Sequence, residues 1–535
     1  MTRFLSRDWR RLLALLMAGL MALAPLQGAW AQVRLPALGE SATEDFSVGT
    51  EKRVGEQIMR EIRRDPEFLD DPVLQEYVDS IWTRLVAAAH KRGDIEGDID
   101  HQFAWEPFLV RDKTVNAFAL PGGYVGVYLG LIALTTTSDE LASVMAHELS
   151  HITQRHIARS VVASKHVTLV SLAAMLLGVL AASRSGNIDA VNAAVTGSQA
   201  AIMQGQLNFS RDMEREADRN GYGILGVAGF ATSGMAAMFD KLDKASRLND
   251  SDAYPYLRSH PLTVERISEA RSRTLFGGGG TSSPPLRHAL MQMRAKVLMD
   301  TDPQVLRGMA DRAQGLPESP LRDRLAALYA GAFSASLLRE NARADRLADA
   351  ALALAKTAPQ REPEAERELQ LLQVQLALNR HDAPAAMALL DAITVDANGR
   401  PPLLLRAQAA LELQRENRAG ANVALRQSTE ALQTWVAEHA LDGTAWGLLS
   451  STAGAIGLTL RSLRAGAEAS AAGGDLGGAI DRLRHAQKTA RGAAGQDFIE
   501  ASVIDARLRE LQAQRRELAI EANGGRAPRD DKSSD

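Results

Sequence analysis

Apolar residues recur at helical spacing between residues 48 and 90. One set comprises Val54, Ile58 and Ile62, and a second set comprises Leu74, Val78, Ile81 and Leu85. A spacing of three or four residues places such side chains on one face of an α-helix. Asp70-Asp71-Pro72 separates the two sets, and proline is favoured in the first turn of a helix. The pattern therefore predicts two helices that meet at this break.

The periodicity changes to alternation after residue 102, which indicates β-structure. Phe103 and Trp105 form one alternating pair, and Phe108 and Val110 form another, with Pro107 between the pairs. Because proline has no N–H to donate to a sheet, we expect an edge strand or a bulged strand here.

A β-hairpin is predicted for residues 116–128, which read NAFALPGGYVGVY. Two apolar segments flank the turn-forming sequence Pro121-Gly122-Gly123 at its centre. Farther along, Ser138-Asp139-Glu140 provides the start signal of a helix. This helix contains the sequence HELSH.

Residues 167–182, VTLVSLAAMLLGVLAA, are almost wholly apolar. The run is slightly short for a membrane span, which takes about 20 residues. We interpret it as a buried or lid-like helix with a surface able to face a membrane. Two membrane spans within residues 160–206 are the alternative.

The chain beyond residue 285 is rich in Ala, Leu and Arg, and its pattern predicts helices to about residue 520. Similar turns end successive apolar helices: LLREN at 337–341, LNRHD at 378–382, LQREN at 413–417 and AAGGD at 471–475. The last residues of these turns lie 41, 35 and 58 positions apart, and Asp442 resembles one more repeat start in the longest gap. A period in the thirties is typical of tetratricopeptide repeats, with a generic helical array as the alternative. Either array would offer a concave surface for binding proteins.

The composition of the chain excludes several kinds of functional site. A chain of 535 residues suggests two or three domains, and a net charge of −4 gives no sign of a nucleic-acid partner. The chain has no cysteine, which excludes disulfides, iron–sulfur clusters, thiolate metal sites and cysteine nucleophiles. Any metal site must therefore use His, Asp and Glu.

The N-terminus has the layout of a secretory signal peptide, residues 1–31. A basic start precedes an apolar run from Leu12 to Leu26, and Ala29-Trp30-Ala31 places small residues where cleavage needs them. The run is short for a membrane helix. We expect export to the periplasm after cleavage near Ala31, with a retained membrane anchor as the alternative.

The sequence HELSH carries the candidate chemistry. His147 and His151 are four residues apart, so they share one face of the predicted helix and can bind one zinc ion. Glu148 lies beside that face, where it can take a proton from a water whose pKa zinc has lowered to about 7. Two unrelated surface histidines are the alternative, but apolar neighbours such as Val144 and Ile152 indicate a buried helix.

A catalytic zinc ion takes three protein ligands and leaves a fourth position open. In SRDMEREADRNGYG, residues 210–223, Glu214 and Asp218 also share one face of a predicted helix. Glu214 is suited to be the third ligand, and Asp218 is suited to hold a ligand histidine through its free N–H. Such acidic pairs are commonly surface features, and the HELSH sequence upstream favours the metal site.

Together these motifs resemble the HtpX-like zinc peptidases, a gluzincin family, over about residues 51–267. The resemblance includes the sequences NAFALPGG and AHELSHI. It implies one zinc ion per chain, bound by His147, His151 and Glu214, with Glu148 as the general base. Asp218 falls where the family has a second acid, described for some members as a proton donor.

The expected fold is mainly α with a small β-sheet. A zincin-type metallopeptidase domain would be followed by an α-helical, tetratricopeptide-like solenoid. The expected boundaries are a metallopeptidase domain at 48–276, a linker at 277–285, the repeat domain at 286–520 and a disordered tail at 521–535.

His260 lies in RSHPLTVERI, ahead of a proline and a new helix. In the resembled family a histidine in this context can occupy the fourth zinc position and shut the enzyme off. His260 is therefore a candidate regulatory ligand, and Arg266 is a candidate residue for orienting the site. A loop histidine that only caps a helix is the alternative.

A candidate substrate-binding edge strand precedes the zinc helix. Extended substrates commonly add to an edge strand through main-chain hydrogen bonds, and the alternative is that this strand is only core. The candidate residues are Asn116, Ala117, Phe118, Ala119 and Leu120. The other histidines are interpreted as structural or surface residues: His90, His101, His156, His166, His288, His381, His439 and His485.

The resemblance implies a periplasmic zinc endopeptidase that degrades misfolded or stalled outer-membrane proteins and assists their assembly. Its expected partners are those unfolded or stalled proteins and, through the repeats, the β-barrel assembly machinery. Peripheral contact with a membrane is a further option, and no nucleic-acid partner is expected. The alternative is a chaperone or scaffold for outer-membrane β-barrel assembly with a latent protease site.

Overall fold

The computed structural model describes residues 46–163, 210–248, 255–276, 285–313, 318–492 and 498–522. The fold is mainly helical with one four-stranded sheet, as the sequence predicts. The expected signal peptide, the apolar run at 167–182, most of the expected linker and residues 523–535 lie outside the described residues. Within the described ranges, no helix combines the length and the apolar character that a membrane crossing requires.

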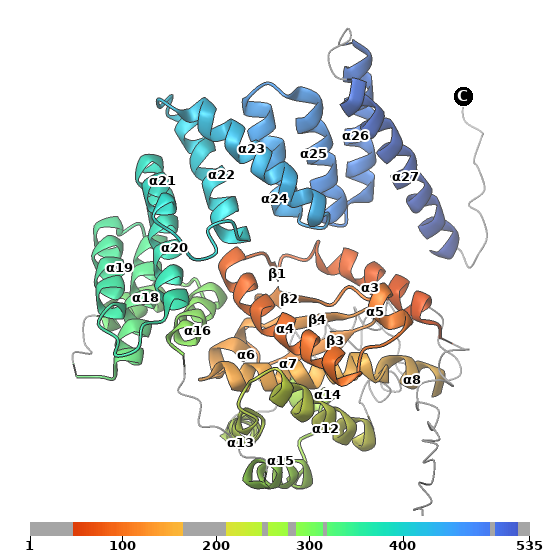
Figure 1. Cartoon of the computed structure of the whole chain (residues 1–535), viewed down its shortest axis with the longest axis vertical. Helices are drawn as coiled ribbons and strands as arrows, with labels where there is room; N and C mark the ends of the chain where they lie inside the picture. The colour runs from red at the N-terminus through yellow and green to blue at the C-terminus, as the bar shows by residue number, and fades with distance from the viewer. Residues whose placement is uncertain are drawn as a thin grey trace, which may run out of the picture. The chain divides into compact units, whose positions relative to one another are not determined.

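The sheet has the strand order β1-β2-β4-β3 (Figure 1). Its strands are β1 (Phe68–Leu69), β2 (Glu106–Val110), β3 (Ala117–Leu120) and β4 (Tyr124–Tyr128). β3 and β4 pair antiparallel and confirm the predicted hairpin, whose turn needs the positive φ of Gly122 and Gly123. β2 runs parallel to β4, and β3 lies at the edge of the sheet.

The strand predicted around Phe108 and Val110 is confirmed as β2, but two other predictions for residues 102–110 are wrong: Phe103 and Trp105 lie outside β2, and the strand that contains Pro107 is not an edge strand. Helix α5 (Asp98–Gln102) ends directly before Phe103, and Trp105 has a φ of 50°, so neither Phe103 nor Trp105 belongs to a strand. Pro107 lies in β2, which is an inner strand. The N–H of Glu106 bonds to Gly123 on the β4 side, so the Pro107 nitrogen faces the other side. β1 pairs only with Leu109 and Val110, so the missing N–H of proline breaks no pairing.

The helix that carries HELSH is α7 (Ser138–Thr153), as predicted, and all of its residues after Ser138 are buried. It packs against strands β3 and β4 and, apart from the helix that follows it in the chain, against three helices. These helices are α4 (Pro72–Arg92), α12 (Arg211–Val227) and α13 (Ser233–Leu248). The other helices before the expected linker are α3 (Val48–Ile62), α6 (Leu129–Leu134), α8 (His156–Ala163), α14 (Tyr256–Ser259) and α15 (Val264–Phe276).

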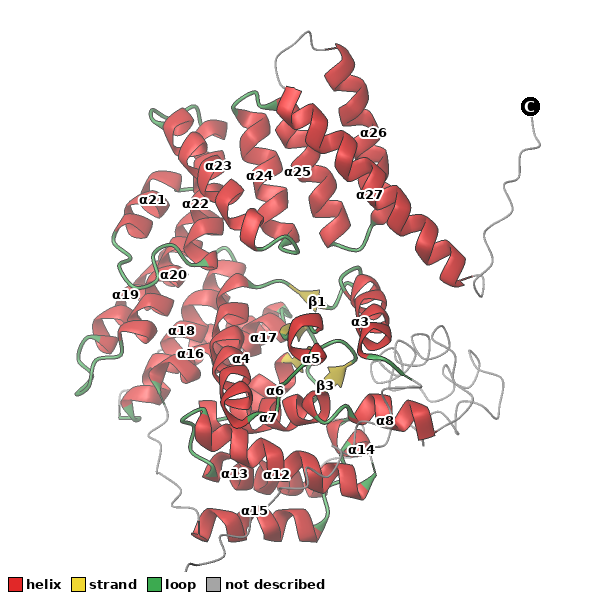
Figure 2. Cartoon of the chain, turned by 45° about the vertical axis from the view of Figure 1, so that its right-hand side comes forward, coloured by secondary structure: helices red, strands yellow, loops and turns green. Residues whose placement is uncertain are grey.

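Only helices are described beyond residue 285 (Figure 2). They are α16 (Leu286–Met299), α17 (Pro303–Arg312), α18 (Leu321–Leu337), α19 (Asn341–Ala355), α20 (Pro363–Asn379), α21 (Ala383–Asp391), α22 (Arg400–Arg415), α23 (Ala421–Glu438), α24 (Gly443–Ala455), α25 (Thr459–Ala472), α26 (Leu476–Gly492) and α27 (Phe498–Ala522). From α17 onward consecutive helices pack on one another, and the predicted turn motifs lie between them. This is the predicted helical array.

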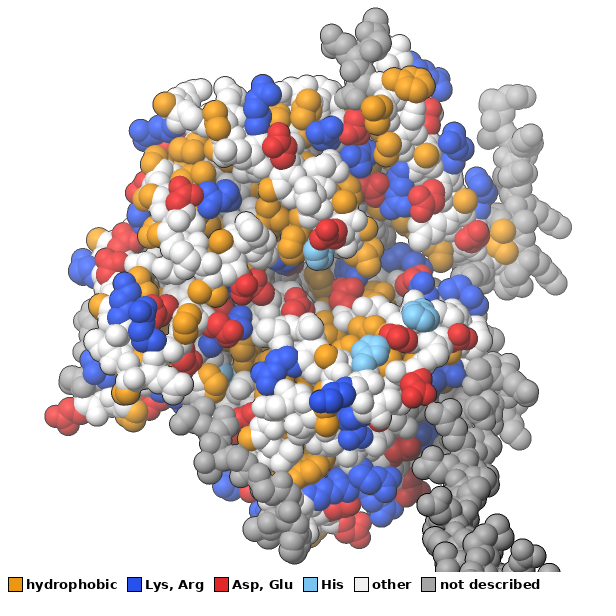
Figure 3. Space-filling view, viewed as in Figure 1, with side chains coloured by type: hydrophobic (Ala, Val, Ile, Leu, Met, Phe, Trp, Pro, Cys, Tyr) orange, Lys and Arg blue, Asp and Glu red, His pale blue; other side chains and the backbone are white. Residues whose placement is uncertain are grey.

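The hydrophobic core continues across the expected linker. One cluster of buried residues contains Leu85 of α4 and Leu149 of α7 together with Leu290 of α16 and Leu372 of α20. Helix α16 also packs directly against α6 and α4. The first helices of the array therefore share a core with the sheet-containing half. On the face seen in Figure 3, basic and acidic side chains of the described residues are interspersed, in keeping with the small net charge.

Candidate metal centre

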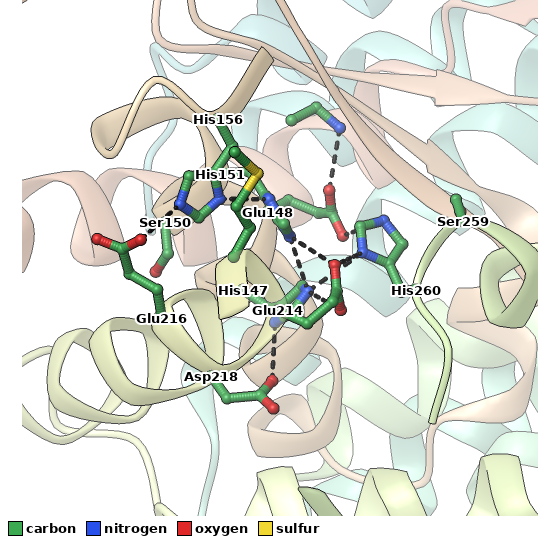
Figure 4. A network of polar contacts seen from close by, with 12 residues as sticks. His147, Glu148, Ser150, His151, His156, Glu214, Glu216, Asp218, Ser259 and His260 are labelled. Carbon is green, nitrogen blue, oxygen red and sulfur yellow. Dashed lines mark hydrogen bonds and ion pairs between the residues drawn. The ribbon is translucent and has the colours of Figure 1, made fainter. Parts of the chain in front are cut away.

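Four potential metal ligands converge in the interior of the sheet-containing half (Figure 4). His147 and His151 come from adjacent turns of α7, and Glu214 comes from α12. His260 follows the last residue of α14. One ligand atom from each residue lies within 4.8 Å of the others, and all four side chains are buried. The structure thus brings together residues from three separate parts of the sequence.

The spacing of the ligand atoms fits one zinc ion. His147 Nε2 lies 3.0 Å from His151 Nε2 and 3.3 Å from His260 Nδ1. Glu214 Oε1 lies 2.9 Å from His260 Nδ1 and 3.4 Å from His151 Nε2. Ligands at about 2.0 Å around a tetrahedral zinc ion are separated by about 3.3 Å. Three imidazole nitrogens and a carboxylate oxygen also form a donor set that zinc prefers.

Glu148 is buried beside these ligands. Its Oε2 accepts a hydrogen bond from the main-chain N–H of Ala119, at 3.0 Å. Its Oε1 lies 3.5 Å from His260 Nε2. Burial raises the pKa of Glu148, against the opposing effect of the neighbouring His260 and His147. A carboxylate with a raised pKa is a better proton acceptor, which suits a general base.

Asp218 and Arg266 lie behind His147. Asp218 Oδ1 is 3.0 Å from His147 Nδ1, and the Arg266 guanidinium donates to both Asp218 oxygens, at 2.6 and 2.8 Å. Arg266 also contacts Glu214 Oε2, at 2.8 Å. Burial alone would lower the pKa of His147, but the carboxylates of Asp218 and Glu214 raise it to about 10. Arg266 therefore ties together the two carboxylates that face His147.

The candidate substrate strand lies next to Glu148. β3 is an edge strand, and α7 packs against it. Asn116 precedes β3, and its C=O accepts a hydrogen bond from Tyr128 N–H. The Phe118 ring contacts the rings of Phe108 and Tyr128, with centroids 5.8 and 5.9 Å away. The strand thus contributes side chains to the core while its outer main-chain edge faces away from β4.

The sequence interpretation missed two residues of the site. His156 is fully buried, and its Nδ1 lies 2.8 Å from His151 Nδ1, so it belongs to the polar network of the metal centre. The Tyr256 ring stacks on His260, with centroids 4.7 Å apart. Both residues have a local signal: His156 follows HELSH closely, and Tyr256 precedes His260 by four positions.

The remaining histidines agree with their interpretation as structural or surface residues where they are described. His288 is buried away from this network, and His166 lies outside the described residues. The exposed histidines are His90, His101, His381, His439 and His485.

Comparison with known proteins shows that the chain is similar to peptidases, in agreement with the geometry of the site. Residues 72–274 match the model of peptidase family M48. The chain is 30% identical over 488 residues to the β-barrel assembly-enhancing protease of Yersinia pestis, covering 90% of this chain and 92% of that protein. It is 38% identical over 260 residues to the putative β-barrel assembly-enhancing protease of Vibrio cholerae, covering 48% of this chain and 49% of that protein. This second match therefore spans only about half the length of either protein.

A more distant similarity extends to mitochondria. A mitochondrial metalloendopeptidase of Schizosaccharomyces pombe is 29% identical over 232 residues, which cover 42% of this chain and 60% of that protein. The Vibrio cholerae and Schizosaccharomyces pombe proteins each match less than half of this chain.

Proposed function

This chain belongs to peptidase family M48, whose members are zinc-dependent metallopeptidases, and we propose that it acts as a zinc endopeptidase. The observation that carries the proposal is the convergence of His147, His151 and Glu214 with Glu148 buried beside them. A metal site that served only to stabilise the fold would not need a further buried carboxylate beside its ligands.

Each residue of the centre has a role in this proposal. His147, His151 and Glu214 hold the zinc ion, which supplies the Lewis acidity that makes water a nucleophile near neutral pH. Glu148 takes a proton from the attacking water and returns it to the amine leaving group. Asp218 Oδ1 lies 3.0 Å from His147 Nδ1, and this contact fixes the orientation of that ligand. Its contact with His147 and Arg266 supports this positioning role over that of a proton donor to the substrate.

We assign His260 the role of a regulatory fourth ligand. Its Nδ1 faces Glu214 and His147, while its Nε2 faces Glu148. The ring therefore fills the space between the metal ligands and the general base, where a substrate carbonyl and water would have to enter. In this state the enzyme is latent, and substrate or a partner has to displace His260.

The proposed substrates are unfolded or stalled outer-membrane β-barrel proteins, and the proposed compartment is the periplasm. The names of the two bacterial relatives, which refer to β-barrel assembly, support the assignment of the substrates. The expected signal peptide, cleaved near Ala31, is part of this proposal. A substrate main chain would pair with the outer edge of β3. The helical array, interpreted as tetratricopeptide repeats, would recruit these substrates or dock on the β-barrel assembly machinery.

A second candidate is a chaperone or scaffold for outer-membrane β-barrel assembly with a latent protease site. The position of His260 between Glu148 and the ligands favours it, because this arrangement blocks the metal centre. The two functions predict different results for a chain that has lost its general base.

The test compares the wild-type chain with Glu148→Gln and His260→Ala. Zinc content and cleavage of an unfolded outer-membrane β-barrel protein are measured for each. A latent endopeptidase contains about one zinc ion per chain, loses cleavage in Glu148→Gln and gains it in His260→Ala. Bound zinc without cleavage in any of the three proteins would contradict the proposal and favour the scaffold.

A further inference from the structure

His151 has a chain of hydrogen-bonding partners behind it, on the side away from the other metal ligands (Figure 4). His151 Nδ1 lies 2.8 Å from His156 Nδ1, and His156 Nε2 lies 3.2 Å from Glu216 Oε2. Arg159 donates to the same Glu216 oxygen, at 3.0 Å. Both histidines are fully buried, whereas Glu216 is partly exposed.

The direction of each hydrogen bond follows from the metal site. His151 Nε2 faces His147 and Glu214, so it must carry no hydrogen when it binds a metal ion. The hydrogen of the neutral ring then lies on Nδ1, which donates to His156 Nδ1. His156 Nδ1 acts as an acceptor, so the His156 hydrogen lies on Nε2 and points at Glu216. Each imidazole N–H between His151 and Glu216 therefore meets an acceptor.

A strained turn brings His156 into this position. On a continuous helix, residues five apart point in directions that differ by about 140°, so His156 would face away from His151. Helix α7 instead ends at Thr153, and Arg155 adopts a φ of 50°, which is unfavourable for a residue with a side chain. The turn is held by Arg155, which donates to Glu51 Oε2 at 3.1 Å and to the C=O of Phe46 at 2.6 Å.

His147, the other ligand histidine on α7, also has a carboxylate and an arginine behind its ring. His147 Nδ1 faces Asp218, which binds Arg266, so one carboxylate and one arginine lie behind it. Behind His151, the carboxylate and arginine are Glu216 and Arg159, and His156 is inserted between them and the ligand. The imidazole of His156 thus takes the place of a direct carboxylate contact to His151 and holds the His151 ring in a fixed orientation.

We propose that His156 and Glu216 form a relay that holds His151 in the tautomer and orientation that bind zinc. The inference rests on the proposed zinc site. His156 is a positioning residue, because it contacts the ligand and not the metal position. Partners of this kind commonly change metal affinity by about 10- to 100-fold when they are removed.

The test measures the zinc dissociation constant of the full chain by competition with a chelator. The variants are His156→Ala, Glu216→Ala and the double variant. The matched control is His288→Ala, which removes another buried histidine away from the site. The relay predicts that His156→Ala raises the zinc Kd by about 10- to 100-fold, and that Glu216→Ala raises it by a smaller factor. The double variant should match His156→Ala, because Glu216 acts only through His156.

The visible spectrum of the cobalt-substituted chain provides a second readout. It should change in His156→Ala and stay unchanged in His288→Ala, since only the first variant removes the partner of a metal ligand, His151. An unchanged Kd in folded His156→Ala, or an equal loss in His288→Ala, would overturn the relay. If His156→Ala does not fold, the zinc Kd of Glu216→Ala tests the relay, because the Glu216 side chain is partly exposed and its removal should leave the fold intact. A wild-type Kd in Glu216→Ala overturns the relay.

These results are independent of peptidase activity. If the wild-type chain binds zinc but cleaves nothing, the proposed endopeptidase function fails while the relay is still tested by zinc affinity. If the wild-type chain cleaves and both relay variants bind zinc with the wild-type Kd, only the relay fails.

Discussion

His288 and His156 are both fully buried histidines, but they serve different parts of the molecule. His156 supports a metal ligand, whereas His288 joins three elements of the fold. Its Nδ1 lies 2.6 Å from the Tyr77 hydroxyl, and its Nε2 lies 3.2 Å from the C=O of Thr135. These contacts connect α16 to α4 and to the residue that follows α6. At the residue scale, a buried histidine can be interpreted only from its partners.

Burial of His288 makes the stability of the fold depend on pH. Burial lowers its pKa to about 4, whereas the unfolded chain has a histidine pKa of about 6.5. Above pH 6.5 both states are neutral, and the residue adds no pH dependence. As the pH falls from 6.5 to 4, the unfolded state binds the extra proton, and the free energy of unfolding drops by up to about 3 kcal/mol.

We therefore expect His288→Gln to lose stability more slowly than the wild type as the pH falls through this range. The measurement is the urea midpoint of both proteins at several pH values from 7 to 4.5. Exposed His485→Gln is the control, and its curve should run parallel to that of the wild type. A curve for His288→Gln that also runs parallel would show that this residue does not titrate as argued.

At the scale of one element, β3 connects the sheet to the general base. The C=O of Asn116 accepts from Tyr128 N–H, and the antiparallel register then turns the N–H groups of Phe118 and Leu120 toward β4. The N–H groups of Ala117 and Ala119 face the outer edge, and that of Ala119 binds Glu148. The position of this one donor thus follows from the register of the hairpin.

Replacing Ala119 with proline removes the N–H that holds Glu148 and breaks no hydrogen bond to β4. A hydrogen bond to a charged group contributes about 1.5–3 kcal/mol, so we expect kcat to fall by about 10- to 100-fold. Ala117→Pro removes the other outward N–H of β3 and should raise KM more than it lowers kcat, because it affects only strand pairing with substrate. Equal losses of kcat in the two variants would contradict a specific link between Ala119 and the general base.

Sequence patterns predicted the elements whose signals are local. The i, i+4 spacings of His147 with His151 and of Glu214 with Asp218 place these residues on the faces where the structure has them. The two-residue strand β1 has no periodicity to detect, and the sequence does not show that β1 leaves the Pro107 nitrogen unpaired within an inner strand. His156 was missed because its role depends on a turn at Arg155 and on Glu216, 60 residues away. Predictions failed where tertiary contacts, and not local spacing, define the structure.

At the scale of the whole described chain, the N-terminal end of α4 forms ion pairs between the sheet-containing half and the helical array. Three acidic residues in and just before α4 each bind an arginine of a different array helix. These pairs are Asp70 with Arg400 of α22, Asp71 with Arg294 of α16, and Glu76 with Arg367 of α20. The helical array is therefore attached at several points along its length.

The Asp71–Arg294 pair should be the most sensitive of these contacts. The Arg294 guanidinium donates to both Asp71 oxygens, at 2.6 and 2.7 Å, and the arginine side chain is fully buried. Removing one partner leaves a buried charge, so Arg294→Met should lower the free energy of unfolding by about 3–5 kcal/mol. Arg343→Met, which removes a pair with exposed Asp311, should change it little. Denaturant unfolding of both variants checks the prediction, which fails if their losses are equal.

The shared core also limits where the chain can be divided. A chain that ends at residue 276 would lose Leu290 and Met291, which belong to the same buried cluster as Leu85 and Leu149. Exposing that apolar surface should destabilise α7, so we expect this truncation to aggregate or to lose zinc. A chain that ends at residue 457 loses α25, α26 and α27, whose buried residues belong to clusters separate from that of α7, and should keep its zinc. Zinc content and thermal unfolding of the two truncations distinguish the cases. A stable, zinc-containing chain that ends at residue 276 would show that the sheet-containing half folds without the array.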